Sequence, residues 1–367
     1  MLKERLEEKA YLPILRMTNG EHVTEENWYT RRREMLALLE RYSYGKTLPS
    51  PIRVWDEPIG EINYIAYAGK VIEQRVNICF EAEGEKKPFK FPVDIFIPKS
   101  VEKPPVILHI AFRPVPDRYI PVEEITDMGY ALVVMTYTDI VNDNQYGDFS
   151  GGIAAYFKKK RARTDTEWGK IGMWAYGASR VMDFIKTRED LDGERVAVSG
   201  HSRLGKTALW CGAQDERFAA VISNNSGYGG AATSKHGEGE RVTDFIRCGS
   251  WDWYCGRFKD YAGEMEDKKP YDQAYLLALI APRLLIVGSA KEDKGADPKS
   301  EFLTTLHASS AWEIFGKKGL VTPDELPKPS TILDDGCACY HYRAGRHFFS
   351  REDWNAYMDI LDKKWAK

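Results

Sequence analysis

The chain contains 367 residues, 43% of them hydrophobic and 12% aromatic, which is enough to bury the core of one large domain or two ordinary ones. Its 52 basic and 55 acidic residues give a formal net charge of -3, so composition predicts no general attraction to nucleic acid or to an anionic membrane. No apolar run reaches the length of a membrane span, and residues 1–9 are charged rather than apolar. We therefore expect a cytoplasmic protein without a signal peptide.

The six cysteines are expected to be free thiols, because a cytosol keeps thiols reduced. Cys337 and Cys339 are separated by one residue, which is not the spacing of a zinc-binding pair, and no second pair accompanies them. The sequence therefore predicts no metal site and no cofactor.

The first 50 residues are predicted to form a helical extension packed on a main domain of residues 51–367. Residues 25–44 carry apolar side chains at helical spacing. Gly45, followed by two prolines at positions 49 and 51, is typical of the end of a helix.

The main domain begins with short alternating stretches, such as 76–80 and 91–97, which predict antiparallel strands. Residues 106–111 and 131–136 are apolar enough for strands that are buried on both faces of a sheet. A predicted helix over 171–186 comes next, and further strands end near residues 200, 223 and 289. This alternation predicts an α/β fold with a mostly parallel central sheet, helices on both faces, and an N-terminal helical and antiparallel addition.

The turn that carries Ser202 is the most informative segment, and two different chemistries can use it. Residues 200–207 satisfy the phosphate-loop pattern, whereas a strand, Gly-X-Ser and a helix together form a nucleophile elbow. A phosphate loop needs an aspartate at the end of a second strand to help hold Mg²⁺. The two best later strands run into Asn224 and Ala290 instead. We favour the elbow, and nucleotide binding is the alternative from another class.

An elbow serine requires a base, and His347 is the predicted base. A serine hydroxyl is a poor nucleophile until an adjacent base, itself oriented by a carboxylate, activates it. In hydrolases of this kind the serine comes first, then the acid, then the histidine. Residues 340–347 lie late in the chain before a predicted C-terminal helix, and His341 is the competing histidine.

The predicted acid of the triad lies in the loop after the strand 284–289. Asp293 is the favoured residue, and Glu292 and Asp297 are the alternatives on the same loop. The non-catalytic alternative for Asp293 is a solvated loop charge beside two lysines. The non-catalytic alternative for Ser202 is a helix N-cap. Order and spacing together favour a triad of Ser202, Asp293 and His347.

The turn Gly-His-Ser-Arg-Leu-Gly-Lys resembles the Gly-X-Ser-Arg-X-Gly-Lys signature of the glucuronoyl esterases, carbohydrate esterase family fifteen, which are α/β-hydrolases. Further segments are similar to that family in the same order. They are residues 168–180, 223–232, 296–298 and 345–354. The resemblance extends over about residues 90–365 and implies an α/β-hydrolase fold and an esterase of glucuronic acid esters.

The resemblance also implies roles for three charged residues. Arg203 is expected to stabilise the oxyanion, while Lys206 and Glu240 are expected to contact the sugar. Two cations in the first turn of a helix suit a developing oxyanion or an acidic sugar, because a helix N-terminus already favours anions. The competing interpretations are a solvated helix face for Lys206 and a plain surface charge for Glu240.

The chain departs from the family pattern at several positions. Asn225 stands where the family commonly has a catalytic Glu, and an amide cannot supply the negative charge that stabilises an imidazolium. Gly295 replaces the aromatic residue that stacks on the sugar, although Trp251 or Trp253 could supply another stacking face or be buried in the core. The usual glycine two residues after the nucleophile is displaced by one position, to Gly205.

We therefore predict a metal-free serine esterase that acts on carbohydrate esters through an acyl-enzyme on Ser202, and we favour glucuronoyl esters. A sugar O-acetyl or other O-acyl esterase with the same triad is the alternative within the class, and a catalytically inactive binding protein is a further alternative because of Asn225. The expected partner is a small-molecule or oligosaccharide ester, with no nucleic acid and no membrane. The oligomeric state is not predicted.

Overall fold

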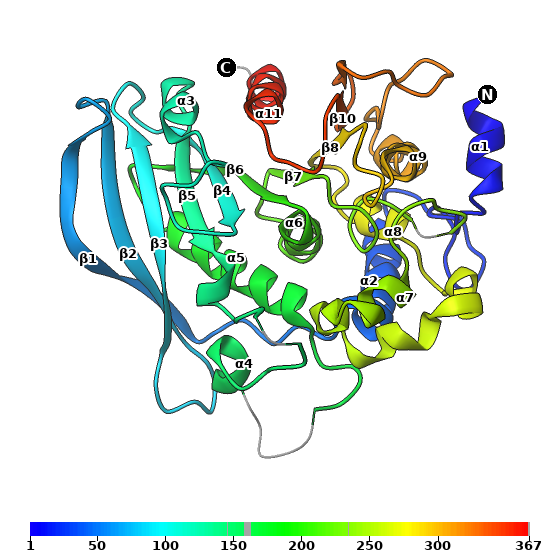
Figure 1. Cartoon of the computed structure of the whole chain (residues 1–367), viewed down its shortest axis with the longest axis horizontal. Coiled ribbons are helices and arrows are strands. Elements are labelled where there is room, and N and C mark those ends of the chain that lie inside the picture. Colours follow the sequence, from blue (N-terminus) through cyan, green and yellow to red (C-terminus); the bar gives the residue numbers. More distant parts are fainter. Residues whose placement is uncertain (145, 158–162, 234, 366–367) are drawn as a thin grey trace.

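The computed structural model describes residues 1–144, 146–157, 163–233 and 235–365. Within these residues one sheet of ten strands runs through the molecule in the order β1-β2-β3-β5-β4-β6-β7-β8-β10-β9 (Figure 1). The strands are β1 (Arg53–Ala66), β2 (Val71–Glu81), β3 (Phe89–Pro98), β4 (Pro105–Ala111), β5 (Ala131–Thr136), β6 (Asp192–His201), β7 (Ala220–Asn224), β8 (Leu284–Ala290), β9 (Thr331–Leu333) and β10 (Ala338–Arg343).

Helices precede the sheet and connect its strands. The α-helices are α1 (Leu2–Glu8), α2 (Trp28–Leu39), α3 (Val122–Asp127), α4 (Gly152–Tyr156), α5 (Lys170–Ile185), α6 (Arg203–Gln214), α7 (Val242–Arg247), α8 (Gln273–Ala278), α9 (Pro298–Ala308), α10 (Ser310–Glu313) and α11 (Arg351–Lys364). Shorter helical segments are the π-helical η1 (Glu40–Tyr44) and the 3₁₀-helical η2 (Tyr137–Asp139), η3 (Ser250–Trp253), η4 (Gly256–Tyr261) and η5 (Gly263–Lys268).

The central strands β5, β4, β6, β7, β8 and β10 are parallel, and β1, β2 and β3 extend the sheet in antiparallel pairing. Every residue of β4, β5 and β8 is buried, as expected for strands covered by helices on both faces. The predicted α/β fold with a mostly parallel sheet and an antiparallel N-terminal part is confirmed.

Two hydrophobic cores lie on opposite faces of this sheet. Alternate residues of one strand divide between them: Val106, Leu108 and Ile110 join the larger core, and Ile107 joins the smaller one. The larger core is packed against α5, α6 and α8, whereas α3 and α11 cover the other face (Figure 1). The carboxyl ends of the parallel strands therefore meet along one edge between these layers, where loop residues can converge.

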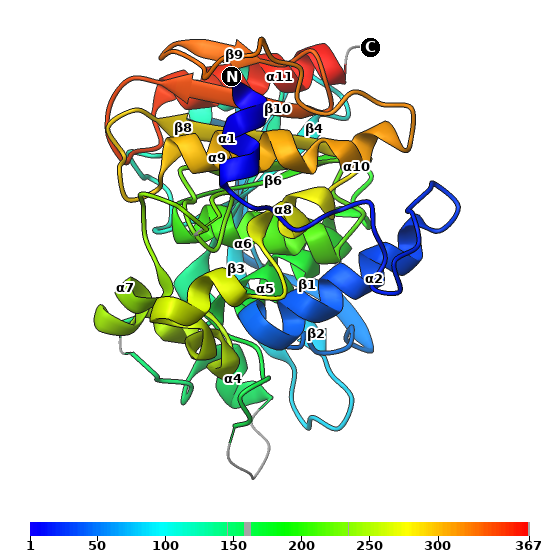
Figure 2. The same cartoon turned by 90° about the vertical axis from the view of Figure 1, so that its right-hand side faces the viewer.

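Residues 1–50 hold α1, α2 and η1, and their apolar side chains join the larger core. Leu2, Trp28 and Met35 are all buried there. Figure 2 shows α1 lying across α9, where Nζ of Lys9 donates a hydrogen bond to Oγ of Ser300 over 2.7 Å.

Two local details differ from the sequence prediction. The helix predicted over 25–44 begins only at Trp28, and its last turn, η1, is π-helical. It ends at Gly45, whose φ is +82° and whose absent Cβ would lie 2.3 Å from the Trp168 backbone, so this position requires glycine. Residues 338–343 form the parallel strand β10, which the sequence did not reveal because its polar residues break the apolar pattern.

In the described part of the chain, none of the helices has both the length and the apolar character to cross a membrane. All six cysteines are free thiols, and five of them are buried or half-buried, which agrees with the sequence prediction.

Candidate active site

Ser202 lies on a strained turn between β6 and α6. Its backbone has φ +58° and ψ -127°, and its N–H donates to the carbonyl of Asn224 over 2.9 Å. A Cβ at position 200 would lie 2.2 Å from the carbonyl oxygen of Leu204, so the strand can turn so sharply only at glycine. A Cβ at position 205 would lie 3.1 Å from the Gly200 carbonyl oxygen, so glycine at this position allows the helix to approach the strand closely. This is the geometry of a nucleophile elbow.

The phosphate-loop alternative does not fit this arrangement. Its lysine would have to reach a bound phosphate, but Lys206 is buried and donates from Nζ to the carbonyl of Ser226 over 2.5 Å. The same Nζ lies 3.6 Å from Oε2 of Glu240. The interpretation of Lys206 as part of a solvated helix face is also wrong, because the side chain is only 4% exposed.

His347 and Asp293 come together beside this turn, at the ends of neighbouring parallel strands. Nδ1 of His347 is 2.6 Å from Oδ2 of Asp293. The same Oδ2 accepts a hydrogen bond from Nδ2 of Asn225 over 2.9 Å. Burial raises the pKa of Asp293, but its hydrogen bonds to His347 and Asn225 outweigh that effect and hold the pKa below its usual value. Asp293 therefore stays ionised beside the imidazole.

The alternatives on the same loop point elsewhere. Glu292 is exposed and lies 3.5 Å from Nε of Arg346. Asp297 caps α9, accepting from the N–H of Ser300 over 3.0 Å. His341 is buried, and its Nε2 lies 3.4 Å from Oδ1 of Asp353. Of the residues considered, only Asp293 and His347 form a hydrogen-bonded acid–imidazole pair.

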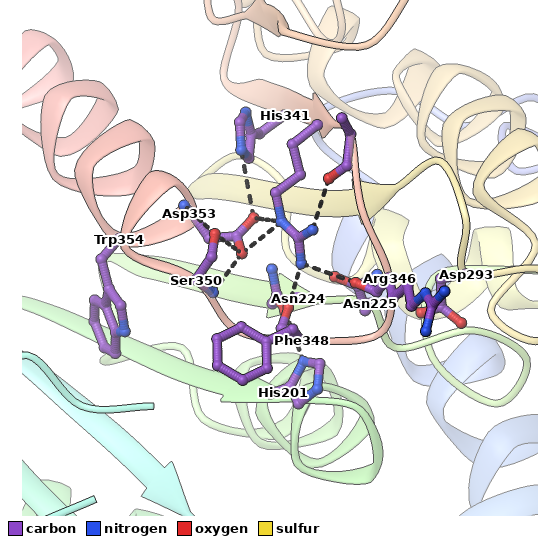
Figure 3. A network of polar contacts seen from close by, with 12 residues as sticks. His201, Asn224, Asn225, Asp293, His341, Arg346, Phe348, Ser350, Asp353 and Trp354 are labelled. Atoms are coloured by element: carbon purple, nitrogen blue, oxygen red, sulfur yellow. Dashed lines mark hydrogen bonds and ion pairs between the residues drawn. The ribbon is translucent and has the colours of Figure 1, made fainter. Parts of the chain in front are cut away.

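Sequence reasoning missed the network that shapes the loop of His347. Arg343, at the end of β10, donates from Nε to both carboxylate oxygens of Asp353 over 2.8 and 2.9 Å. Its Nη groups donate to the carbonyls of Ala344, Arg346 and Phe348, which flank the histidine (Figure 3). Asp353 also accepts from Ser350 at the start of α11. The network ties the histidine loop to a strand and a helix.

His201, the residue before Ser202, packs against His347. The two ring centroids are 4.4 Å apart. Nδ1 of His201 lies 2.7 Å from Oδ1 of Asn224 (Figure 3). Nδ2 of Asn224 donates to the Tyr357 hydroxyl over 2.7 Å. Burial, reinforced by the neighbouring His347, lowers the pKa of His201 to about 3. His201 is therefore neutral, so it does not compete with His347 for a proton.

Arg203 directly follows Ser202 and begins α6. Its Nη1 is 2.5 Å from Oδ2 of Asp143, and its guanidinium lies 4.3 Å from the centre of the Trp253 ring. Trp253 is buried at the edge of the larger core, as one of the two sequence interpretations had it, and its ring also contacts Arg203. Trp251 is half-buried under Lys259.

Lys206 and Glu240 form a pair between α6 and the loop before α7. Burial lowers the pKa of Lys206 although Glu240 raises it. The Glu240 carboxylate is 42% exposed, and its backbone N–H donates to the carbonyl of Gly295 over 3.0 Å. Gly295 thus lies beside Glu240 without presenting a ring there. No group of three or more His, Cys, Asp or Glu side chains suited to a metal ion occurs among the described residues.

A parallel α/β sheet with a strained serine elbow and an acid–imidazole pair at the next strand ends defines a hydrolase of the α/β-hydrolase fold. The family model described as "Glucuronyl esterase, fungi" matches residues 80–316. A carbohydrate esterase from an unknown prokaryotic organism is 35% identical over 94% of this chain and 87% of its own length. The chain belongs to the glucuronoyl esterase family, carbohydrate esterase family fifteen, and is a carboxylic ester hydrolase.

Solved structures agree with this family. A glucuronoyl esterase from Solibacter usitatus superposes with a TM-score of 0.85 and 34% identity, covering 97% of this chain and 98% of that one. A structure described as a promiscuous esterase of family fifteen from a marine bacterial metagenome gives a TM-score of 0.85 and 32% identity over 96% of both chains. The predicted family is confirmed.

Proposed function

We propose that the chain hydrolyses glucuronoyl esters through an acyl-enzyme on Ser202, with His347 as the base and Asp293 as the acid that orients it. The observation that carries the proposal is the 2.6 Å contact between Nδ1 of His347 and Oδ2 of Asp293, beside a serine on a strained elbow. An ionised carboxylate only accepts hydrogen bonds, so Nδ1 carries a proton and Nε2 is the basic nitrogen. This tautomer is the one that a serine hydrolase requires.

The reaction has two balanced steps. The Ser202 oxygen attacks the ester carbonyl while its proton passes to Nε2 of His347, and the resulting tetrahedral oxyanion collapses as the alcohol leaves with that proton. A water molecule then attacks the acyl-enzyme, gives its proton to His347, and releases the uronic acid as the serine recovers the proton. Arg203 and its backbone N–H, which directly follows the nucleophile, are the proposed donors to the oxyanion.

A fluorophosphonate probe tests the nucleophile. The intact protein should be labelled at Ser202, and Ser202→Ala should abolish both labelling and ester hydrolysis, because the acyl-enzyme cannot form. Ser199, a buried serine on β6 that hydrogen-bonds His109 over 2.9 Å, provides a matched control: Ser199→Ala should still be labelled. Labelling that persists in Ser202→Ala would overturn the proposal.

The substrate class rests on the cationic and acidic pair beside the elbow. Glu240 is 42% exposed and lies 3.6 Å from the buried Nζ of Lys206, so its carboxylate is the member of the pair that can accept hydrogen bonds from sugar hydroxyls. We expect methyl or benzyl glucuronate to be cleaved with a higher kcat/KM than acetylated xylose or p-nitrophenyl acetate. Gly295 argues for the sugar O-acyl esterase alternative, since it presents no ring for stacking. Faster acetate release from acetylated sugars would favour that alternative and leave the esterase chemistry intact. The cytoplasmic location stays a prediction.

A further inference from the structure

We infer that Asp143 is a positioning residue that fixes the Arg203 guanidinium for the oxyanion. The inference rests on the proposed role of Arg203 and names the group on which that role depends. Asp143 lies in the loop after β5 and η2, 60 residues before Arg203, and is only 2% exposed through its side chain.

Both oxygens of the Asp143 carboxylate are used. Oδ2 receives Nη1 of Arg203 at 2.5 Å, and Oδ1 receives Nε1 of Trp253 at 2.9 Å. The indole that donates to Asp143 also lies beneath the guanidinium, with its ring centre 4.3 Å from Cζ of Arg203. One buried carboxylate therefore holds the arginine at its edge and, through Trp253, at its face.

A second charged pair lies behind Asp143. Nζ of Lys170 is 2.7 Å from Oδ2 of Asp252 and 3.6 Å from Oδ1 of Asp143. Oδ2 of Asp252 also accepts the backbone N–H of Gly147 over 2.8 Å. Arg203, Lys170, Asp143 and Asp252 thus form one compact group. Asp143 contacts Arg203 directly, whereas Asp252 contacts the buried Lys170.

Part of the guanidinium can face a substrate, because the Arg203 side chain is 31% exposed. Arginine carries five N–H donors, and Asp143 occupies only Nη1; Nε is buried and makes no hydrogen bond within the described residues. An arginine that was free to rotate would have to be ordered during the reaction, whereas donors fixed beforehand stabilise the oxyanion without that entropic cost. Asp143 and Trp253 supply this fixation.

A double-mutant cycle with purified full-length enzyme tests the inference. Asp143→Asn keeps the shape and an acceptor for Trp253 but removes the negative charge that faces Arg203. We expect kcat on the best ester substrate to fall by about 10- to 100-fold while KM changes less than about twofold, the signature of a group that acts in the transition state. In the Arg203→Ala background the same change should lower kcat by less than about twofold, because its target is gone.

Asp252→Asn is the matched control, because Asp252 is as buried as Asp143 but contacts Lys170 and not Arg203. It should lower the melting temperature and leave kcat, counted per fluorophosphonate-labelled serine, within about twofold of the parent. Active-site titration keeps the test valid if part of a variant fails to fold. Trp253→Phe keeps an aromatic ring but removes the indole N–H that donates to Asp143, so it is a second variant that disturbs the same carboxylate.

The outcomes separate the two claims. Equal losses from Asp143→Asn in both backgrounds would overturn the positioning role and leave the proposed esterase intact. An Arg203→Ala variant with unchanged kcat would overturn the role of Arg203 and, with it, the inference about Asp143. Loss of labelling at Ser202 in the parent enzyme would instead count against the proposed function.

Discussion

The two sides of Ser202 are built in the same way for different tasks. On one side His347, 45% exposed, is held by Asp293, 8% exposed, over 2.6 Å. On the other side Arg203, 31% exposed, is held by Asp143, 2% exposed, over 2.5 Å. Each carboxylate also accepts a neutral N–H at 2.9 Å, from Asn225 or from the Trp253 indole, and Asp293 accepts a further one from the backbone of Ala296 over 3.3 Å.

The difference lies in the cation. An imidazole gains and loses a proton during each turnover, whereas a guanidinium is charged throughout. In the proposed mechanism the carboxylate beside His347 therefore selects a tautomer and stabilises a transient charge, whereas the carboxylate beside Arg203 only fixes the direction of the guanidinium. We expect the first carboxylate to matter much more to catalysis than the second.

The largest expected effect follows from Asp293→Asn. The amide preserves the shape but favours the wrong imidazole tautomer, a loss on the order of 10⁴ in turnover in the best-studied triad. We expect a loss of this order in kcat at nearly unchanged KM, measured by steady-state hydrolysis of a glucuronate ester. Glu292→Gln, on the same loop and exposed, is the control and should be silent. If Asp293→Asn left kcat nearly unchanged, the carboxylate beside His347 would matter no more to catalysis than the one beside Arg203.

Asn225→Ala tests the same side of the site, where Asp293 holds His347. A role of Asn225 in packing alone does not fit the structure, because its amide donates to the Asp293 carboxylate over 2.9 Å. Hydrogen bonds to charged groups contribute about 1.5–3 kcal/mol, which corresponds to roughly a 10- to 100-fold loss in kcat/KM. The comparison of kcat/KM with that of the parent at neutral pH measures it. A loss below twofold would restore the packing interpretation.

Glu240→Gln tests the proposed contact of Glu240 with the sugar. Removing the charge 3.6 Å from Nζ of Lys206 should raise KM for a glucuronate ester by roughly tenfold, because one charge-assisted contact to the sugar weakens. KM for p-nitrophenyl acetate, which has no sugar, is the internal control and should change little. Equal increases for both substrates would indicate a general disturbance of the site.

Glu301 shows what happens to a buried carboxyl whose hydrogen-bond partners are neutral. It accepts from the Ser289 hydroxyl over 2.5 Å and from the Gly227 N–H over 2.8 Å. Burial raises its pKa to about 8, whereas the pKa of Asp293, next to an imidazole, is lowered.

This raised pKa predicts a pH dependence of stability. Below about pH 4.5 Glu301 is neutral in both the folded and the unfolded chain, and its contribution is fully present. As the pH rises toward 8 only the unfolded chain releases the proton, so the free energy of unfolding falls by at most about 1.4 kcal/mol per pH unit from this group. Glu301→Gln should flatten that decline in urea unfolding curves measured between pH 5 and 8. An unchanged slope would contradict the raised pKa.

The sequence by itself determined the strand–turn–helix with Ser202, the late histidine and the acidic loop, since these depend on local apolar runs, glycines and chain order. It also favoured Asp293 over its neighbours, and the structure places Asp293, not Glu292 or Asp297, against His347. The catalytic roles of these residues stay predictions. The family resemblance in several segments led to the family that the comparisons show.

Only the tertiary structure decided which distant groups serve these residues. Asp143 meets Arg203 across 60 positions, and Arg343 meets Asp353 from a strand that the apolar pattern did not reveal. A single aspartate in a loop carries no local signal of its partner, because the partner is set by which strand ends the parallel sheet brings to one edge. Local sequence is therefore enough to predict the turn that carries Ser202. The contacts that fix Arg203 and His347 beside it depend on the packing of the whole sheet.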